Sequence, residues 1–573
     1  MPVHNTDISD VLSKTADLLE IKGENQFRIR AYRDAARTIG GLSKNVADMV
    51  DEGGDLSRLP GIGKDLASKI AEIVKKGTFP LLQELQKEIP GELSIIMKVA
   101  GLGAKRVKAI YEELGVDSLD KLKEAVENKR IRELEGFGEK TEQSILEGIK
   151  RIKKGKERLP IAAADQIAGP FLDYLKKEKK IKDIIVAGSY RRRRQTVKDL
   201  DILVTCSKGS KIMDRFINYE DVGEVISRGK TRSSIRLRSG FQVDLRVVPQ
   251  VSYGSALHYF TGSKAHNIAV RKIAVSKGLK ISEYGVFKGK KRVAGRSEES
   301  VYKKVGLSYI EPELRENRGE IEAARKKNLP DLIDLKDIRG DLHIHTNYTD
   351  GHNSLEEMAE AAQKKGYDYI AITDHSKKVR VAGGLDEKEL AKEIKKIDKI
   401  NKELKSIVIL KGVEVDILED GSLDLSEDIL KDLDLTVCAI HSKFNLTSQK
   451  QTERIIRAMD NPNFNILAHP TGRRINEREP YDIDMDKIMK EAKKRGCILE
   501  LNSHRDRLDL DDVHCKAAKD IGLKIAISTD SHSRGDLDFI KFGVSQARRG
   551  WIEAADVINT RSLREFKKIL KRK

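Results

Sequence analysis

The sequence contains no long hydrophobic run and no Cys-x-x-Cys pair, and only three histidines lie in its first 342 residues. A membrane span needs roughly 18 consecutive apolar residues, so the missing run excludes one, and the start of the chain shows no signal-peptide core. The four cysteines show no metal-binding spacing, which suits a reducing cytosol. We therefore expect a cytoplasmic protein that makes no contact with a membrane.

The net charge of +18 is unevenly distributed along the 573 residues. Residues 339–573 hold 43 Lys and Arg against 42 Asp and Glu, so almost the whole basic excess lies upstream. This distribution suits a polyanionic partner in the upstream part, and a basic surface without a partner is the alternative. The length exceeds what one hydrophobic core can organise, so we expect roughly three or four domains.

A Gly-x-Gly pattern occurs three times in the first 150 residues, each time between an apolar residue and an amphipathic helix. The glycines are Gly61 and Gly63, Gly101 and Gly103, and Gly136 and Gly138. Such pairs permit a tight turn whose backbone N–H groups, together with a following lysine, can hold a phosphate. The repeats predict helix-hairpin-helix units that hold the DNA backbone without reading its sequence. Plain helix packing is the alternative.

Three aspartates are placed to share one site in the middle of the chain. Side chains alternate along a strand, so Asp199 and Asp201 in DLDILV point to one face, and we expect Asp244 in FQVDLRVVP to add a carboxylate from a neighbouring strand. Clustered carboxylates repel one another unless divalent cations lie between them. The pattern predicts two Mg²⁺ or Mn²⁺ ions and in-line phosphoryl transfer.

Seven short apolar runs follow residue 340, with helical patterns between most of them, which predicts a parallel α/β barrel. Polar residues near the run ends would face one cleft at the C-terminal rim, where such barrels place their chemistry. The predicted metal ligands are His343, His345, Asp350, His375, Glu414, His441, His469, Asp530 and His532. This set is large enough for three ions, and imidazole favours Mn²⁺ or Zn²⁺ over Mg²⁺.

The order of the hairpins, opened by AYRDAARTI, resembles the N-terminal lyase domain of DNA polymerase beta and its relatives. The resemblance implies that Lys69 forms a Schiff base with the sugar left at an abasic site, and that Tyr32 supports the pocket. A second family lysine falls on Asp65 in this chain.

The GS…DxD…D pattern resembles the nucleotidyltransferase superfamily, and HYFTGSKAHNIAVR (258–271) resembles the nucleotide-binding segment of family X DNA polymerases. The resemblance implies that Gly188, Ser189 and Arg192 bind the triphosphate. It further implies that Tyr259, Phe260 and Gly262 line the pocket for the sugar of the incoming nucleotide. Asn267 would contact the new base, and Arg271 would contact the template strand. The family commonly has Gly where this chain has Arg193 and Lys198, and polymerase beta has Arg where this chain has Gln242.

The motifs HIH, TDH, GVE, AHP and TDSH resemble the polymerase and histidinol phosphatase (PHP) domain, and the whole chain resembles a bacterial or archaeal family X polymerase with a C-terminal PHP domain. The implied fold is multidomain: an α-helical helix-hairpin-helix part, an α+β nucleotidyltransferase core and a distorted seven-stranded α/β barrel. The expected segments are a lyase-like domain (1–90), a further hairpin segment (91–154), the polymerase core (155–309), a linker (310–338) and the PHP domain (339–573).

The resemblance implies a monomeric, gap-filling DNA polymerase in DNA repair that acts on gapped or nicked duplex DNA and dNTPs. It also implies a metal-dependent 3′–5′ exonuclease in the PHP domain, with abasic-site cleavage and 5′-deoxyribose phosphate lyase as further activities. Two alternatives stay open: the PHP part could be a small-molecule phosphatase, or the chain could be a DNA-binding scaffold. Complete ligand sets argue against the scaffold, because structural metal sites are usually closed and four-coordinate.

Overall fold

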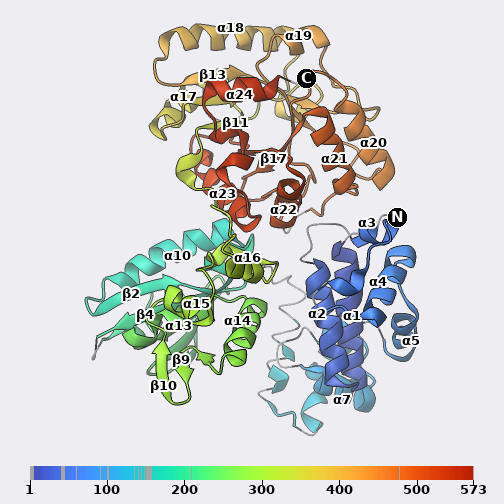
Figure 1. Ribbon diagram of the computed structural model, residues 1–573, viewed down its shortest axis with the longest axis vertical. Coiled ribbons are helices and arrows are strands. Elements are labelled where there is room, and N and C mark those ends of the chain that lie inside the picture. The colour runs from blue at the N-terminus through green and yellow to red at the C-terminus, as the bar shows by residue number, and fades with distance from the viewer. Residues whose placement is uncertain are drawn as a thin grey trace. The chain divides into compact units, whose positions relative to one another are not determined.

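The computed structural model divides the chain into two compact units, Met1–Glu157 and Arg158–Lys573 (Figure 1). It describes residues 5–40, 46–59, 61–90, 92–97, 99, 102–134, 136–139, 141–143, 145–146, 149, 158–207, 210–475 and 478–571. No helix within these ranges has both the length and the apolar character that crossing a membrane requires.

The first unit is helical, and short helices flank its glycine turns. Its elements are α1 (Asn5–Lys22), α2 (Gln26–Gly40), α3 (Val46–Asp51), η1 (Leu56–Arg58), α4 (Lys64–Lys76), α5 (Pro80–Glu88), α6 (Leu93–Ile96), α7 (Ala104–Leu114), α8 (Leu119–Glu127) and η2 (Ile131–Glu133). Helix α4 buries Leu66, Ile70 and Ile73, which share one face at helical spacing. It ends at Gly77, whose φ of 71° reverses the chain.

The second unit begins with an α+β core built on a mixed sheet. Its elements are β1 (Leu159–Pro160), α10 (Ile161–Lys176), β2 (Ile181–Val186), α11 (Gly188–Arg191), β3 (Thr196–Val197), β4 (Asp199–Cys206), α12 (Ile212–Ile217), β5 (Val222–Arg228), β6 (Arg232–Leu237) and β7 (Gln242–Val247). The five-stranded sheet has the order β2-β4-β7-β6-β5, and β4 and β7 are its one parallel pair. This pairing carries the end of the IIVA…DLDILV motif next to the strand that contains Asp244.

Helices and a small antiparallel sheet complete this core. They are η3 (Gln250–Ser252), α13 (Tyr253–Thr261), α14 (Lys264–Ser276), β8 (Lys280–Ser282), β9 (Gly285–Lys288), β10 (Lys291–Ala294) and α15 (Glu298–Val305). The segment expected as a linker holds η4 (Pro312–Leu314), α16 (Glu320–Lys326) and η5 (Leu335–Asp337). Leu314, Ile321 and Leu332 from this segment are buried in the same hydrophobic cluster as Val270, so the segment is packed against the core.

The rest of the second unit alternates strands with helices. It comprises β11 (Gly340–Ile344), α17 (Leu355–Lys364), β12 (Tyr369–Ile372), η6 (Arg380–Ala382), α18 (Glu387–Glu403), β13 (Val408–Lys411), β14 (Glu414–Asp416), α19 (Glu427–Lys431), β15 (Val437–Ala439), α20 (Ser448–Ala458), β16 (Ile466–Leu467), α21 (Met485–Arg495), β17 (Ile498–Asn502), α22 (Asp512–Ile521), β18 (Ile525–Ser528), η7 (Asp536–Phe539), α23 (Ile540–Arg549), η8 (Ala554–Asp556), η9 (Ile558–Thr560) and α24 (Leu563–Leu570). All strand pairs are parallel, and helices surround the strands in Figure 1. The predicted α/β class is confirmed.

The barrel differs in one detail from the seven expected strands, because the run around Gly412 forms two short strands. The chain leaves β13, which pairs with β12, and enters β14, which pairs with β15. A Cβ atom added at Gly412 would lie 2.8 Å from the carbonyl oxygen of Ile372, so the break depends on a close backbone approach. A parallel bridge between Ile344 and Ser531 joins the first strand to the segment that follows β18.

Candidate active sites

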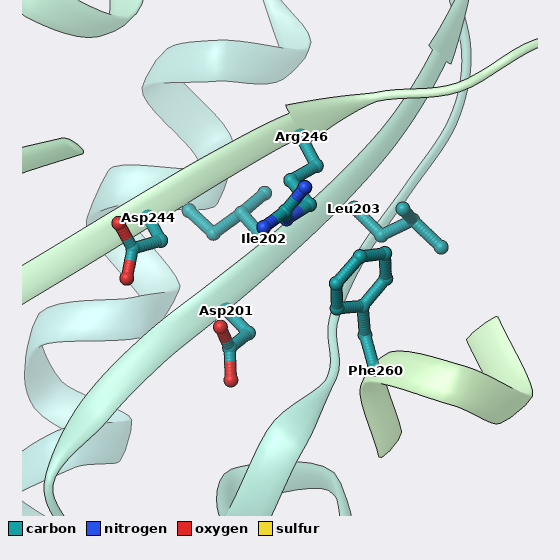
Figure 2. Close-up of a pocket in the computed structure, with 6 residues that line it drawn as sticks. All are labelled: Asp201, Ile202, Leu203, Asp244, Arg246 and Phe260. Atoms are coloured by element: carbon teal, nitrogen blue, oxygen red, sulfur yellow. The ribbon is translucent and has the colours of Figure 1, made fainter. Parts of the chain in front are cut away.

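Three aspartates meet on one face of the five-stranded sheet. Asp199 and Asp201 lie on β4, and Asp244 lies on β7 as the direct parallel partner of Asp201. Figure 2 shows Asp201 and Asp244 on the two neighbouring strands, with Arg246 and Phe260 close by. The prediction that a neighbouring strand supplies the third carboxylate is confirmed. Arg246, two residues after Asp244, was not predicted, although the strand alternation places it on the same face.

The environment of Asp199 and Asp201 opposes their ionisation. Burial, reinforced by the charges of Asp199 and Asp244, raises the pKa of Asp201 to about 7. Burial and the charge of Asp244 also raise the pKa of Asp199. Asp244 accepts hydrogen bonds from Ser234 Oγ and, at 3.1 Å, from Gln242 Nε2. Nearby cations such as Arg246 do not offset burial and mutual repulsion at Asp201, whereas divalent cations between the carboxylates would do so.

The turn before β4 is built against Asp201. Gly188 opens α11 with a φ of +62°, and a Cβ atom added there would lie 2.5 Å from Oδ2 of Asp201. Any other residue would therefore be strained and would collide with a candidate metal ligand. Ser189 follows on the same short helix, and Arg192 ends it.

Arg192 joins this turn to the segment after α13. Its Nη1 donates to the carbonyl oxygen of Thr261, and a Cβ atom at Gly262 would lie 3.1 Å from the same Nη1. Its Nε lies 3.0 Å from Oε1 of Glu316. The residues predicted to bind the triphosphate and the sugar are thus brought together, and Glu316 is a partner that the sequence did not indicate.

The remaining residues predicted to bind the nucleotide also lie close together. Asn267 Nδ2 donates to the carbonyl oxygen of Tyr259 at 2.7 Å, and the Arg271 guanidinium lies 6.0 Å from the centroid of the Tyr259 ring. Tyr259 is 36% exposed, which leaves its ring accessible to a ligand. Phe260 stacks on Arg246 at 4.5 Å and faces the aspartates.

The barrel holds a second site, in which all nine predicted ligands come together. Its ligand atoms form three overlapping groups: His345, Asp350, His375 and His532; His343, His345 and Asp530; and His375, Glu414 and His441. His469 joins them through Nε2, which lies 3.0 Å from Oε1 of Glu414. Among the described residues, no other group of three or more His, Cys, Asp or Glu side chains places its ligand atoms within 4.8 Å of one another, so the three sheet aspartates are more widely spread.

The unpaired atoms of this cluster fit metal ions. Nε2 of His343 and both ring nitrogens of His345 are buried without a hydrogen bond. Carboxylate oxygens of Glu414 and Asp530 surround the two Nε2 atoms at 3.2 to 3.6 Å, longer than an ordinary hydrogen bond for three of the four contacts. Burial lowers the pKa of His345 to about 4, which keeps its nitrogens free to act as ligands at neutral pH.

Other side chains hold the ligands from behind. Glu500 on β17 accepts from Nδ1 of His343 at 2.8 Å and from the backbone N–H of His469 at 2.7 Å. Asp416 on β14 lies 3.2 Å from Nδ1 of His441. Such carboxylates orient ligating imidazoles. We missed both in the sequence, although Asp416 stands two residues after Glu414 in the GVEVD motif.

The side chain of Arg507 also lies at this cluster, and the sequence did not indicate it. Arg507 Nε lies 3.5 Å from Oδ2 of Asp530, and its Nη1 is buried with no hydrogen bond. Burial lowers the pKa of His469, and the charge of Arg507 adds to that effect. An arginine with a free donor beside a metal-ligand cluster can hold a phosphate oxygen.

The glycine turns of the first unit present open backbone. Gly63 and Gly103 are the N-caps of α4 and α7, whereas Gly61 and Gly136 have φ values of +76° and +77°. A Cβ atom at Gly63, Gly103 or Gly138 would meet nothing within 4 Å. Neither backbone strain nor internal packing therefore explains these three glycines, whereas close approach of an external ligand would. Gly101 lies outside the described residues.

Lys69 lies on α4 between an aromatic ring and an acid. Its Nζ lies 5.5 Å from the Tyr32 ring centroid and 2.6 Å from Oδ2 of Asp65, one helical turn earlier. Burial opposes the charged ammonium, but the hydrogen bond to Asp65, together with the nearby Tyr32, outweighs burial and raises the pKa of Lys69. The structure thus brings Lys69 and Tyr32 together as predicted, and Asp65 stabilises the protonated lysine.

Four protein families match consecutive parts of the chain. A helix-hairpin-helix domain matches residues 3–79, a SAM-like helix-hairpin-helix tandem 93–151, the DNA polymerase beta thumb 256–316 and the PHP domain 341–528. DNA polymerase lambda of Rattus norvegicus is 25% identical over 346 residues, 55% of this chain and 56% of that protein. A probable phosphatase of Thermoanaerobacter sp. (strain X514) is 32% identical over 247 residues, 41% of this chain and 96% of that protein.

A further relative matches from end to end. The DNA polymerase/3′–5′ exonuclease PolX of Bacillus subtilis (strain 168) is 40% identical over 574 residues, which cover 100% of both chains. Together with the thumb and PHP matches, this identity shows that the chain belongs to the family X DNA polymerases that carry a C-terminal PHP domain.

Proposed function

We propose that this chain fills short gaps in DNA during repair and removes 3′-terminal nucleotides, with the two reactions at separate sites. The observation that carries the proposal is the presence of two different sites in one compact unit. One is a triad of aspartates on a sheet, and the other is a histidine-rich cluster in the barrel. The full-length relative, a DNA polymerase/3′–5′ exonuclease, supports the pairing of the two activities.

In primer extension, the 3′-hydroxyl of the primer attacks the α-phosphate of a dNTP and pyrophosphate leaves. Asp199, Asp201 and Asp244 would hold Mg²⁺ or Mn²⁺, and such ions stabilise the attacking and leaving oxygens when bound. The N–H groups of the Gly188–Ser189 turn and the Arg192 guanidinium would bind the triphosphate. Residues 259–271 would hold the sugar and the base pair, in the roles that the family resemblance implies.

In exonuclease action, water attacks the terminal phosphodiester and the 3′-nucleotide is released. The nine barrel ligands would hold the ions, which activate water and neutralise phosphate charge when bound. Three overlapping ligand groups support three ions, and the imidazole donors favour Mn²⁺ or Zn²⁺. The free donor of Arg507 is placed to hold a phosphate oxygen of the DNA. Cleavage at abasic sites would use the same groups.

One gapped duplex with a labelled primer separates these activities. With dNTPs and Mg²⁺ the primer should lengthen, and with Mn²⁺ and no dNTPs it should shorten from its 3′ end. A small phosphomonoester, tested in parallel, addresses the alternative raised by the similarity to a probable phosphatase. Hydrolysis of the phosphomonoester without any shortening of the primer would favour the phosphatase and reject the exonuclease.

DNA binding is assigned to the helix-hairpin-helix turns, and the basic excess upstream of residue 339 supports this. The open backbone at Gly63, Gly103 and Gly138 would approach phosphates of gapped or nicked duplex DNA. We keep the segments 1–90, 91–154, 155–309, 310–338 and 339–573 as the proposed domain organisation, and a monomer as the proposed assembly.

A lyase reaction is proposed at Lys69, and Asp65 is expected to slow it. A Schiff base requires the neutral amine, whereas Asp65 stabilises the ammonium. Replacing Asp65 with Asn should therefore increase borohydride trapping on an incised abasic site roughly several-fold, because the ammonium loses the carboxylate that stabilises its charge. Lys69→Ala should abolish trapping, and Glu72→Gln, one turn further along α4, is the matched control. Equal trapping by the Lys69→Ala variant and the unaltered chain would place the nucleophile elsewhere.

A further inference from the structure

A buried arginine of the barrel reaches into the polymerase core. Arg549, the last residue of α23, has a side chain that is only 3% exposed. Its Nη1 donates to the backbone carbonyl of Arg192 at 2.7 Å and lies 3.1 Å from Oε1 of Glu316. Its Nη2 donates to Oδ2 of Asp512 on α22 at 2.6 Å. One guanidinium therefore ties a barrel carboxylate to two groups of the core.

Glu316 interacts with arginines from both the barrel and the polymerase core. Its Oε1 also accepts from Nε of Arg192 at 3.0 Å, and its Oε2 lies 3.6 Å from Nη1 of Arg194. Burial opposes ionisation, but Arg549, Arg192 and Arg194 lower the pKa of Glu316 to about 2. The carboxylate is therefore charged at neutral pH, and its interaction is divided among three guanidinium groups.

The contact is fixed by packing as well as by charge. Leu508 and Phe542, both from the barrel, are buried in the hydrophobic cluster of the polymerase core together with Phe171. Arg318 of the core lies 3.0 Å from Oδ2 of Asp512, the same oxygen that Arg549 contacts. Buried apolar contacts and charge-assisted hydrogen bonds on both sides hold Arg549 in one geometry.

We propose that Arg549 is a positioning residue for nucleotide incorporation, so that the barrel sets the triphosphate-binding turn of the polymerase. This inference rests on the proposed role of Arg192 in triphosphate binding. Arg549 holds the main chain of Arg192 directly and draws Glu316 partly away from its side chain. Without Arg549, the Arg192 carbonyl loses its donor and Glu316 pairs more completely with Arg192. The guanidinium is then less available to a triphosphate.

Replacing Arg549 with Met should raise the KM for dNTP about tenfold at saturating gapped DNA, roughly the loss of one charge-assisted hydrogen bond. The value of kcat should change less than about twofold, because the aspartate triad is untouched. The KM of Arg549→Lys for dNTP should lie between those of the unaltered chain and of Arg549→Met, since one ammonium cannot bridge three acceptors. Exonuclease activity at the barrel cluster should persist in every variant and shows that the chain is folded.

Arg548→Met is the matched control, because it removes a neighbouring arginine of the same helix that also joins the two parts. Arg548 lies 2.8 Å from Oε1 of Glu313 and 3.1 Å from Oδ1 of Asp334, and among the described contacts it has no hydrogen bond or ion pair with Arg192 or Glu316. The KM of the Arg548→Met variant for dNTP should stay within about twofold of that of the unaltered chain. A tenfold rise in this control as well would show that domain contact in general, rather than Arg549, sets the KM, and would overturn the inference.

A double-mutant cycle with Arg192→Ala separates the two levels of the argument. If Arg192→Ala leaves the KM for dNTP unchanged, the proposed triphosphate role fails and the inference fails with it. If it raises the KM but Arg549→Met does not, the inference alone is wrong. If both raise it, the inference expects Arg549→Met to add little in the Arg192→Ala background, whereas multiplied effects would contradict it. If the Met variant loses both activities, the same cycle with Arg549→Lys decides.

Discussion

Replacing Asp201 with alanine is expected to lower kcat for primer extension by about a thousandfold or more, a loss of about 4 kcal/mol of transition-state stabilisation. Asp201 is the register partner of Asp244 and lies against Gly188, so it stands at the centre of the triad. Burial and the charges of Asp199 and Asp244 raise its pKa to about 7, and divalent cations between the carboxylates would offset that repulsion. Single-nucleotide incorporation into a gapped duplex, measured with Mg²⁺ and with Mn²⁺, tests this expectation.

Exonuclease activity of the same preparation is the internal control, because its ligands lie in the barrel. Asp173→Ala is the matched substitution, since Asp173 is an exposed aspartate on α10 that pairs only with Lys176 among the described ion pairs. It should leave both activities within about twofold of the unaltered chain. Near-normal extension by Asp201→Ala would show that the triad does not hold the catalytic metal.

Replacing Glu414 with Gln is expected to lower 3′–5′ degradation by about a thousandfold while primer extension persists. Glu414 is the carboxylate on which the cluster converges: His375 Nδ1 lies 2.9 Å from Oε2, and His469 and His441 contact Oε1 at 3.0 and 3.3 Å. The amide keeps the size but removes the charge that several ions would share. Shortening of a labelled primer in Mn²⁺ without dNTPs measures the loss.

Metal content distinguishes a lost ligand from an indirect effect. Purified Glu414→Gln protein should retain fewer Mn²⁺ or Zn²⁺ ions per chain than the unaltered protein, as counted by elemental analysis after dialysis. Glu419→Gln, an exposed acid that lies 3.2 Å from Lys443, is the matched control and should change neither quantity. Full exonuclease activity with a full metal content in Glu414→Gln would refute the placement of hydrolysis in this cluster.

Local patterns were enough to predict much of the architecture and of both sites. Strand alternation placed Asp199 and Asp201 on one face, and the ends of apolar runs located His441, His469 and Asp530 at one rim. These predictions worked because a strand has a fixed side-chain period and because parallel barrel strands end together. The pairing of Asp65 with Lys69 follows from the same kind of local rule, since residues four apart on a helix are neighbours.

By itself, then, the sequence determined the secondary structure that carries the ligands, the family resemblance and the separation of an all-oxygen site from a histidine-rich one. Only the tertiary structure revealed partners that are distant in the chain: Glu500 behind His343, and Arg549 beside Arg192, which stands more than 350 positions earlier. No periodicity marks such pairs, because arginine and glutamate are common surface residues whose burial depends on what packs over them. The break at Gly412 was hidden for a related reason, since close approach of two backbones is a property of the assembled barrel.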